Sequence, residues 1–477
     1  MRTREDLQQL QALPLSLKLS LTKDRIRQWV DTYGESGVYV SFSGGKDSTV
    51  LLHIVREMYP DITACYSDTG LEYPELRDFV KTFDNVDIVK PKLGFKETIE
   101  KYGYPFVSKE VSECVYGARK YLTKLLEEET ILTDRQTDRQ TDGMICRIGT
   151  TTKSLLAQAI THNVVAGGVE TSSSNANESI SSRLNTENIT STTTNQTEFL
   201  EQLATTEKLA NVLNDRMKNH KGGNNQRLAL MLGMLTKDQQ IKANIPKKDR
   251  SQFAQVKWKF LLEAPFEISN RCCHVMKKSP MHTYSRKTGK YAITAQMASE
   301  SRLRTQKWIQ FGCNMFDASI PISNPMSFWF EQDVLLYAKL NNIELCKVYG
   351  DIVTEDGSEF NPEGQMNLGI FDDGRACLKT TGCNRTGCCM CGFGLHLEKR
   401  PNRLELIPQF SNSSILDYIL RGGAFDENGL WKPARGGLGY WFVMQYFNVH
   451  GKTDMYIPNY EKYEREYGNE MTKKYLQ

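Results

Sequence analysis

The sequence has little net charge and no long apolar run. Its 60 basic and 57 acidic residues leave a formal charge of +3, so no global basic field predicts a nucleic-acid partner, although local basic stretches such as NIPKKDR remain. No stretch approaches the roughly 20 apolar residues that a membrane span needs. The N-terminal stretch is charged from Arg2 and interrupted at Lys18, which is not the pattern of a leader. We expect a cytoplasmic protein with no membrane partner.

The cysteines of the chain need a separate explanation. A reducing compartment disfavours a disulfide framework, yet the chain has 12 cysteines. Five of them lie between Cys377 and Cys391, and such crowding is typical of a metal site.

Alternating strand and helix patterns fill the first hundred residues. Strands are predicted at GVYVSF, DITACYS and NVDIVKP, and helices at DSTVLLHIVREMY, YPELRDFVKTF and FKETIEKYG. Repeated units of this kind predict an α/β fold with a doubly wound parallel sheet, whose ligands bind beyond the carboxyl ends of the strands. The loop at residues 43–48, SGGKDS, lies at such an end.

The composition changes at residues 125–245, where TDRQTDRQTDG and a Ser/Thr/Asn-rich tract contain too few apolar groups to repay the entropy of ordering. We expect a low-complexity, disordered insert between two parts of the α/β domain, at 36–124 and 246–395, the second with the cysteine-rich region. Residues 1–35 are expected to form a helical segment and residues 396–477 a C-terminal extension.

Ordered patterning returns near residue 251. SQFAQVKWKFLLEAPF predicts a helix and KYAITAQM a strand. SFWFEQDVLLYAKLNN predicts a helix with Ser327 as its N-cap.

The SGGKDS loop has the parts of a phosphate site. Its glycines allow close backbone approach, and its amides and the following helix N-terminus form a donor site for an anion. The lysine adds a positive charge, the serines can donate to phosphate oxygens, and the aspartate can orient the loop or hold Mg²⁺. The alternative is a glycine turn without a ligand. The candidate nucleotide-binding residues here are Ser43, Gly44, Gly45, Lys46, Asp47 and Ser48, with Lys46 and Asp47 as candidate catalytic residues.

SGGKDS resembles the pyrophosphate loop of the adenine nucleotide α-hydrolase-like enzymes. Later segments resemble the phosphoadenosine phosphosulfate (PAPS) reductase branch of that superfamily. SDTGLEYPE is similar to the family's Asp-Thr-Gly segment, and AQMASESRLR is similar to its Glu-Ser-x-x-Arg segment. NPMSFWFEQDVLLYAKLNNIE resembles the helix that follows, and RTGCCMCGFG resembles the Cys-x-x-Cys turn. The resemblance covers about residues 36–116 and 250–395. It implies six further nucleotide-binding residues: Asp68, Thr69, Gly70, Glu300, Ser301 and Arg304.

The chain also departs from this family. Ala295 and Met297 stand where the family has glycine and usually an arginine that helps to hold the anionic substrate. For Arg304 a solvated helix face is the alternative. The reductases attack sulfate sulfur with a cysteine of a Glu-Cys-Gly-Leu-His tail, whereas no cysteine follows Cys391 and no thiol precedes Gly394-Leu395-His396. Cys389 lies inside the crowded turn, where a thiolate is a ligand before it is a nucleophile.

The cysteine pattern resembles that of the iron–sulfur members of the family. The resemblance implies a [4Fe-4S] cluster held by Cys272, Cys273, Cys388 and Cys391. One alternative is a zinc site formed by Cys377, Cys383, Cys388 and Cys391, and the other is a set of core thiols without a ligand. Cationic groups near the first pair that can face a nucleotide or sulfate are Arg271, Lys277 and Lys278.

These observations favour an enzyme that uses an adenine nucleotide. The first hypothesis is cleavage of Mg-ATP between the α and β phosphates, with adenylylation of an acceptor in sulfur transfer. Its partners would be a sulfur donor protein and a nucleic-acid or small-molecule acceptor. The second hypothesis is reduction of PAPS or adenylyl sulfate to sulfite, and the third is a non-catalytic, nucleotide-binding regulatory module.

Overall fold

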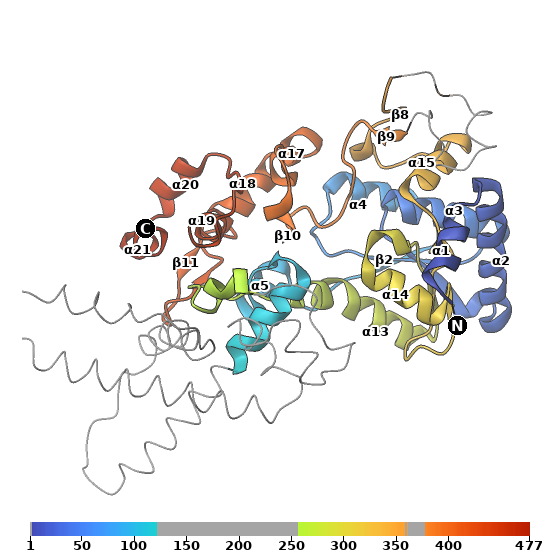
Figure 1. Cartoon of the computed structure of the whole chain (residues 1–477), viewed down its shortest axis with the longest axis horizontal. Helices are drawn as coiled ribbons and strands as arrows, with labels where there is room; N and C mark the ends of the chain where they lie inside the picture. The colour runs from blue at the N-terminus through green and yellow to red at the C-terminus, as the bar shows by residue number, and fades with distance from the viewer. Residues whose placement is uncertain (1, 122–255, 358–359, 361–376) are drawn as a thin grey trace, which may run out of the picture. The chain divides into compact units, whose positions relative to one another are not determined.

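The computed structural model describes residues 2–121, 256–357, 360 and 377–477, so the expected insert at 125–245 lies outside the described residues (Figure 1). The chain divides into two compact units. Unit 1 contains Met1–Lys101, Arg271–Cys391 and Glu398–Ile419, and unit 2 contains Tyr102–Asn270, Gly392–Leu397 and Leu420–Gln477.

Unit 1 is built on a six-stranded sheet in the order β3-β2-β1-β5-β7-β6. Its strands are β1 (Val38–Phe42), β2 (Ala64–Ser67), β3 (Val86–Val89), β5 (Tyr291–Ile293), β6 (Asn314–Met315) and β7 (Ile322–Ser323). All neighbouring pairs are parallel except β6 with β7. The predicted α/β fold with a mainly parallel sheet is therefore confirmed. The chain proceeds from β1 to β2 and β3 on one side and returns to β5 on the other, so the strand order reverses at β1. Parallel sheets bind ligands at such a point.

Helices flank this sheet. Those of unit 1 are α1 (Arg4–Gln11), α2 (Leu15–Tyr33), α3 (Lys46–Met58), α4 (Pro74–Lys81), α5 (Phe95–Tyr102), α12 (Arg271–Cys273), α13 (Ser279–Thr288), α14 (Arg302–Phe311), α15 (Glu331–Leu340), α17 (Arg403–Phe410) and α18 (Ser414–Leu420), of which α5 and α18 end at the border of the unit. The 3-10 turns are η1 (Glu35–Gly37), η5 (Ala298–Glu300) and η6 (Lys347–Tyr349), and η4 (His274–Lys278) is a π-helical turn. A two-stranded pair is formed by β8 (Ile352–Thr354) and β9 (Leu378–Thr380).

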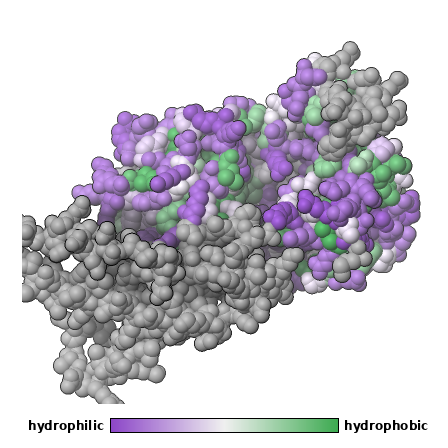
Figure 2. Space-filling view, in the orientation of Figure 1, coloured by the Kyte–Doolittle hydropathy of each residue, from purple (hydrophilic) through white to green (hydrophobic). Residues whose placement is uncertain are grey.

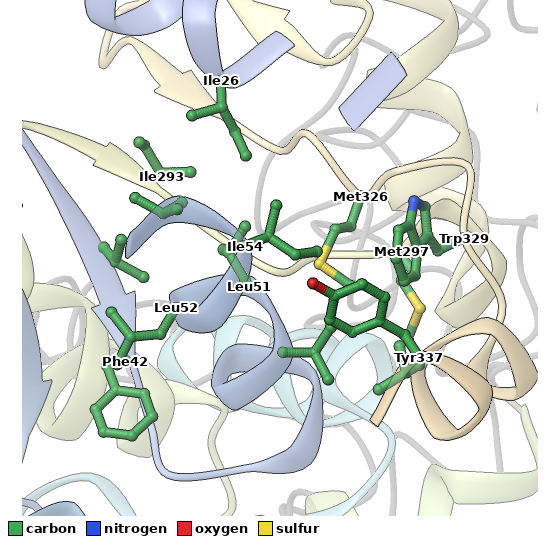
Figure 3. Close-up of a cluster of buried hydrophobic side chains, with 14 of the residues drawn as sticks. Ile26, Phe42, Leu51, Leu52, Ile54, Ile293, Met297, Met326, Trp329 and Tyr337 are labelled. Atoms are coloured by element: carbon green, nitrogen blue, oxygen red, sulfur yellow. The ribbon is translucent and has the colours of Figure 1, made fainter. Parts of the chain in front are cut away.

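The core of unit 1 lies where α3 meets β1 and the neighbouring helices (Figure 3). Leu51 and Ile54, two of the apolar positions that predicted one face of this helix, are fully buried. They share one hydrophobic cluster with Ile26 of α2 and Trp329, whose indole Nε1 donates to Thr22 Oγ1 at 2.9 Å. This packing holds the start of α3, and therefore the SGGKDS loop, at the end of β1.

Two local predictions were wrong. Helix α15 begins at Glu331 and not at Ser327, because the Asp333 carboxylate accepts the Phe330 backbone N–H at 2.7 Å. The hydroxyl of Ser327 instead donates to the carbonyl of Asn324. In the stretch predicted as a helix from residue 251, the described part is a 3-10 helix, η3 (Val256–Leu262).

Unit 2 has an aromatic core. Its elements are β4 (Phe106–Val107), β10 (Gly392–Phe393), η3, η7 (Leu395–Leu397), β11 (Ala424–Phe425), β12 (Trp431–Lys432), α19 (Tyr440–Gly451), α20 (Tyr460–Tyr467) and α21 (Glu470–Leu476). Trp431 packs edge-on against Trp441 of α19 at a ring distance of 5.7 Å. Figure 2 shows that hydrophilic residues cover most of the described surface on the face in view. Among the described residues no helix is long and apolar enough to cross a membrane.

Candidate functional site

The SGGKDS loop is a tight turn between β1 and α3. Gly44 has a φ of +70°, and a Cβ at this position would lie 2.8 Å from Val80 Cγ2 of α4, so both the backbone conformation and the space require glycine. The backbone N–H of Ser43 donates to Ser48 Oγ at 3.1 Å, and Ser48 Oγ donates to the Gly45 carbonyl at 2.9 Å. The two serines predicted to face a phosphate therefore lie together, with their hydroxyl oxygens 3.0 Å apart.

Lys46 is buried, with its side chain 4% exposed. Its Nζ lies 2.8 Å from Glu331 Oε1 and donates to the Asn384 carbonyl at 2.8 Å. Its backbone N–H donates to the Tyr349 hydroxyl at 3.1 Å, and that hydroxyl lies 2.6 Å from Thr386 Oγ1. The segment before the Cys-x-x-Cys turn therefore contacts the ammonium group of Lys46 directly, through Asn384, and reaches the first helical amide through the Tyr349 hydroxyl.

Asp47 carries a carboxylate oxygen, Oδ1, that is buried and has no hydrogen-bond partner among the described residues. Burial raises the pKa of Asp47, and the negative charge of Glu331 raises it further. The positive charges of Lys46, Arg385 and Arg304 act in the opposite direction. An unpaired, buried carboxylate oxygen is the kind of ligand that a hard cation such as Mg²⁺ takes, whereas the nearby charges of Lys46, Arg304 and Arg385 suit the anionic phosphate chain that such an ion accompanies.

The Glu-Ser-x-x-Arg segment brings one of its predicted residues to the loop. Burial lowers the pKa of Arg304, Asp47 opposes this effect, and Arg385 lowers the pKa further, so the three charges lie near one another. Glu300 forms an ion pair with Arg304 and accepts the Met297 backbone N–H. Ser301 is exposed and caps α14. Met297 is 3% exposed and belongs to the hydrophobic core, so it takes no part in anion binding (Figure 3).

The Asp-Thr-Gly segment is tied to its own turn. Asp68 accepts the backbone N–H of Gly70 at 3.2 Å and pairs with Arg77 at 3.1 Å. Thr69 Oγ1 donates to the Glu72 carboxylate at 2.8 Å. Glu72 is 7% exposed and lies 3.8 Å from Lys277 Nζ, which follows the first cysteine pair. This segment therefore connects β2 to the cysteine region.

The four cysteines predicted as cluster ligands lie in one neighbourhood of unit 1. Burial raises the pKa of Cys272, and Cys273, Cys388 and Cys391 raise it further. Burial also raises the pKa of Cys388 to about 11, against the lowering effect of Lys277. Soft thiol donors from two segments are the chemistry that an iron–sulfur cluster needs. In the described residues no group of three or more His, Cys, Asp or Glu side chains stands at metal-ligand spacing.

The remaining cysteines of the turn have other surroundings. Cys377 is exposed at the start of β9, and the Cys383 thiol donates to the Arg385 carbonyl at 2.7 Å. The Cys389 thiol donates to the Leu71 carbonyl at 3.0 Å, and burial raises the pKa of Cys389 to about 12. Cys389 therefore fastens the turn to the Asp-Thr-Gly segment as a neutral thiol.

Sequence reasoning missed the residues that close over the loop. Asn384 and Thr386 have a weak sequence signal, since they directly precede the Cys-x-x-Cys pair. Glu331 and Tyr349 have none, because they reach the loop only through the fold. The missed residues are Glu331, Tyr349, Asn384, Arg385 and Thr386.

The sequence matches the model of a known protein family. The sequence model of the phosphoadenosine phosphosulfate reductase domain matches residues 37–143 and 193–392, which include the loop, the Glu-Ser-x-x-Arg segment and all four predicted cluster ligands.

Curated relatives match over shorter stretches. An uncharacterized protein of Methanocaldococcus jannaschii is 40% identical over 73 residues, which are 14% of this chain and 18% of that protein. An adenosine 5'-phosphosulfate reductase of Staphylococcus haemolyticus is 30% identical over 98 residues, or 19% of this chain and 40% of that protein. The same-named protein of Staphylococcus epidermidis is 26% identical over 97 residues, with the same shares. The chain thus spans less than half the length of each of these relatives.

Proposed function

The chain belongs to the phosphoadenosine phosphosulfate reductase domain family, and from this premise we propose that it binds ATP at the SGGKDS loop and cleaves it between the α and β phosphates. The family relates the chain to nucleotide and sulfonucleotide chemistry. The cleavage would adenylylate an acceptor for sulfur transfer. One observation carries the proposal: the buried, unpaired Asp47 Oδ1 lies at the helix entry of the loop, near Lys46 and the charges of Arg304 and Arg385.

The chemistry is a displacement at the α-phosphorus. A nucleophilic atom of the acceptor forms a bond to this phosphorus, the bond to the bridging oxygen breaks, and pyrophosphate leaves with the electron pair. In the second step, the outer sulfur of a persulfide on a donor protein would attack the activated acceptor and displace AMP. A second thiol of the donor would then attack the inner sulfur, form a disulfide with it and release the thiolated acceptor. The enzyme's task in the first step is to position the triphosphate and neutralise the charge that develops on pyrophosphate.

Each loop residue has a role in this step. The amides and the serine hydroxyls would hold the β and γ phosphates, and Lys46 would exchange Glu331 for a phosphate oxygen. Arg304 and Arg385 would contact the phosphate chain from the other side of Asp47. Asp47 would hold Mg²⁺, which when bound supplies positive charge next to the leaving group. The four cysteines Cys272, Cys273, Cys388 and Cys391 would hold the [4Fe-4S] cluster.

Reduction of adenylyl sulfate or PAPS is the second candidate, and the two staphylococcal relatives named as reductases favour it. Two observations on this chain oppose it. No cysteine follows Cys391 in these 477 residues. Cys389 is hydrogen-bonded and its pKa is raised to about 12, so at neutral pH it provides almost no thiolate.

The test measures both products on the same protein. With Mg-ATP alone we expect pyrophosphate and AMP, because water can take the place of the acceptor: its oxygen attacks the α-phosphorus, pyrophosphate leaves, and its protons pass to the solvent. With adenylyl sulfate or PAPS plus a thiol reductant we expect no sulfite. Asp47→Asn, which keeps the size of the side chain, should lower pyrophosphate release by about 10²-fold, as expected for the loss of an electrostatic stabiliser. The exposed Asp78→Asn of α4 is the control and should leave the rate unchanged.

Other results would decide against the proposal. Sulfite formation without pyrophosphate would favour the reductase. ATP binding without either product would favour the regulatory module.

A further inference from the structure

The helix that follows the first cysteine pair has an unusual charge composition. Residues 271–290 contain no aspartate or glutamate, in a chain whose acidic and basic residues are otherwise nearly balanced. Their basic side chains are Arg271, His274, Lys277, Lys278, His282, Arg286, Lys287 and Lys290. No acidic neighbour on the same helix neutralises these charges.

Four of these side chains form a stripe. His274, Lys278, His282 and Arg286 follow one another at intervals of four residues along η4 and α13, which continue one another without a break (Figure 1). Side chains at this spacing lie on one face of a helix. We call these four residues the basic stripe.

The electrostatic environment of His282 agrees with a shared face. Burial lowers the pKa of His282, and His274, Lys278 and Arg286 all lower it further. Like charges held together in this way repel one another, so an anion that contacts several of them is bound favourably.

The stripe is available to a ligand. His274, Lys278 and Arg286 are exposed, and neither Lys278 nor Arg286 forms a salt bridge with any residue in the described part of the chain. Two neighbouring lysines differ, because Lys277 faces Glu72 and Lys290, just beyond the helix, donates to Thr63 Oγ1 at 3.1 Å.

We propose that the basic stripe binds the phosphodiester backbone of a nucleic acid. Twelve residues of helix rise about 18 Å, so the stripe is long enough to contact more than one phosphate of a strand. The stripe begins next to Cys273, on the same helix as one of the predicted cluster pairs. That the bound nucleic acid is the acceptor of the reaction rests on the proposed function. That the basic stripe binds a nucleic acid does not.

The surroundings favour a nucleic acid over a lipid surface. No exposed large hydrophobic side chain of the described chain falls within residues 271–290. A membrane-binding helix pairs its basic face with apolar side chains that enter the lipid, and this helix has none exposed. Lys278 and Arg286 instead offer two positive charges on one face, and His282 between them adds a hydrogen-bonding imidazole, which suits a phosphate backbone.

The test is fluorescence anisotropy of the full chain with labelled single-stranded DNA, single-stranded RNA and duplex DNA of equal length, each over a series of salt concentrations. We expect binding that weakens with salt, and the three probes identify the kind of strand. Lys278→Gln/Arg286→Gln should reduce the slope of log affinity against log salt by about 1.4–1.8, because each phosphate contact contributes about 0.7–0.9. The charge-conserving variant Lys278→Arg/Arg286→Lys should retain the wild-type slope.

The matched control is Lys307→Gln/Lys474→Gln, which removes two exposed charges elsewhere and should leave the slope unchanged. Absence of binding at low salt, or an equal loss in this control, would overturn the inference. Displacement of the labelled strand by polyglutamate as effectively as by unlabelled nucleic acid would also overturn it, since the stripe would then recognise negative charge alone.

Failure of this inference is distinguishable from failure of the proposed function. Pyrophosphate release without nucleic-acid binding rejects only the basic stripe as a binding surface. Nucleic-acid binding through the stripe without pyrophosphate release rejects only ATP cleavage.

Discussion

At the scale of single residues, the buried carboxylate of Asp47 is costly for the fold. A buried charged oxygen without a hydrogen-bond partner destabilises the folded state. Proteins retain such groups where the chemistry needs them, so the raised pKa of Asp47 is in keeping with the phosphate site proposed for this turn. Stability and activity should therefore respond in opposite directions when this charge is removed.

The pH dependence of stability tests this view. The folded state raises the pKa of Asp47 above its ordinary value of 3.8, so it binds a proton more tightly than the unfolded chain. The stabilisation from this proton is fully present below pH 3.8 and is lost as the pH rises through the folded pKa. Asp47→Asn should therefore be more stable than wild type at neutral pH, and the difference should shrink on acidification. Urea unfolding at several pH values measures it, and a constant difference would contradict the assignment.

Gly44 and Gly70 are required for different reasons: backbone conformation alone at Gly70, and both conformation and space at Gly44. Both have positive φ angles, +70° and +71°. A Cβ at Gly44 would lie 2.8 Å from Val80 Cγ2, whereas nothing lies within 4 Å of a Cβ at Gly70.

Gly70→Ala should cost about 1–2 kcal/mol of unfolding free energy, from backbone strain alone. Gly44→Ala should cost about 1–3 kcal/mol more, because its methyl group also overpacks against α4. Val80→Ala in the Gly44→Ala background should recover part of this second cost. Chemical denaturation gives all three values, and equal costs for the two glycines would show that α4 moves aside.

At the scale of elements, a buried ion pair joins α2 to α15. Lys18 Nζ lies 2.7 Å from Asp333 Oδ2, and both side chains are fully buried. Burial lowers the pKa of Lys18 and raises the pKa of Asp333, so each charge depends on the other. This pair fixes the helix that carries Glu331 next to Lys46.

Removing one partner should be far worse than removing both charges. Lys18→Met should destabilise the protein by about 3–5 kcal/mol, because Asp333 then stays buried and unpaired. Lys18→Met/Asp333→Asn should regain most of this loss. The control is the exposed pair of Arg27 and Asp24, where Arg27→Ala should cost less than about 1 kcal/mol. A double variant as unstable as Lys18→Met would show that packing, and not charge, is lost.

At the scale of the whole molecule, the cysteine neighbourhood joins segments that are distant in sequence. Cys272 and Cys273 precede a π-helical turn, while Cys388 and Cys391 belong to the turn after β9. Between them the chain adds the second half of the parallel sheet and α15. A cluster held by both pairs would link these two segments. It would thereby also hold residues 384–386, which contact Lys46, in place.

Anaerobically purified protein should therefore be brown and contain about four iron atoms per chain. Cys273→Ser and Cys391→Ser should each abolish the colour and lower the thermal stability, whereas Cys383→Ser should keep the iron. Metal analysis and visible absorption measure the outcome. One zinc and no iron, retained in Cys272→Ser and lost in Cys383→Ser, would assign a local zinc site instead.

Local chemistry predicted much of this protein from sequence alone. The apolar spacing at Leu51 and Ile54 predicted α3. The loop was predicted from a strand end that is followed by two glycines and a lysine. Both predictions were possible because a turn and a helix face depend on residues that are close in sequence. The order of its motifs predicted the family, which the domain match confirms.

Only the tertiary structure decided what surrounds the loop. Tyr349 and Asn384 reach Lys46 across about 300 and 340 residues of sequence, and no periodicity records such a contact. It likewise put Met297 in the core and placed the N-cap of α15 at Phe330, whose backbone N–H donates to Asp333, and not at Ser327. The physical reason is the same in each case. Burial and charge pairing depend on which surfaces the fold brings together, whereas the sequence by itself determines only what each short segment prefers.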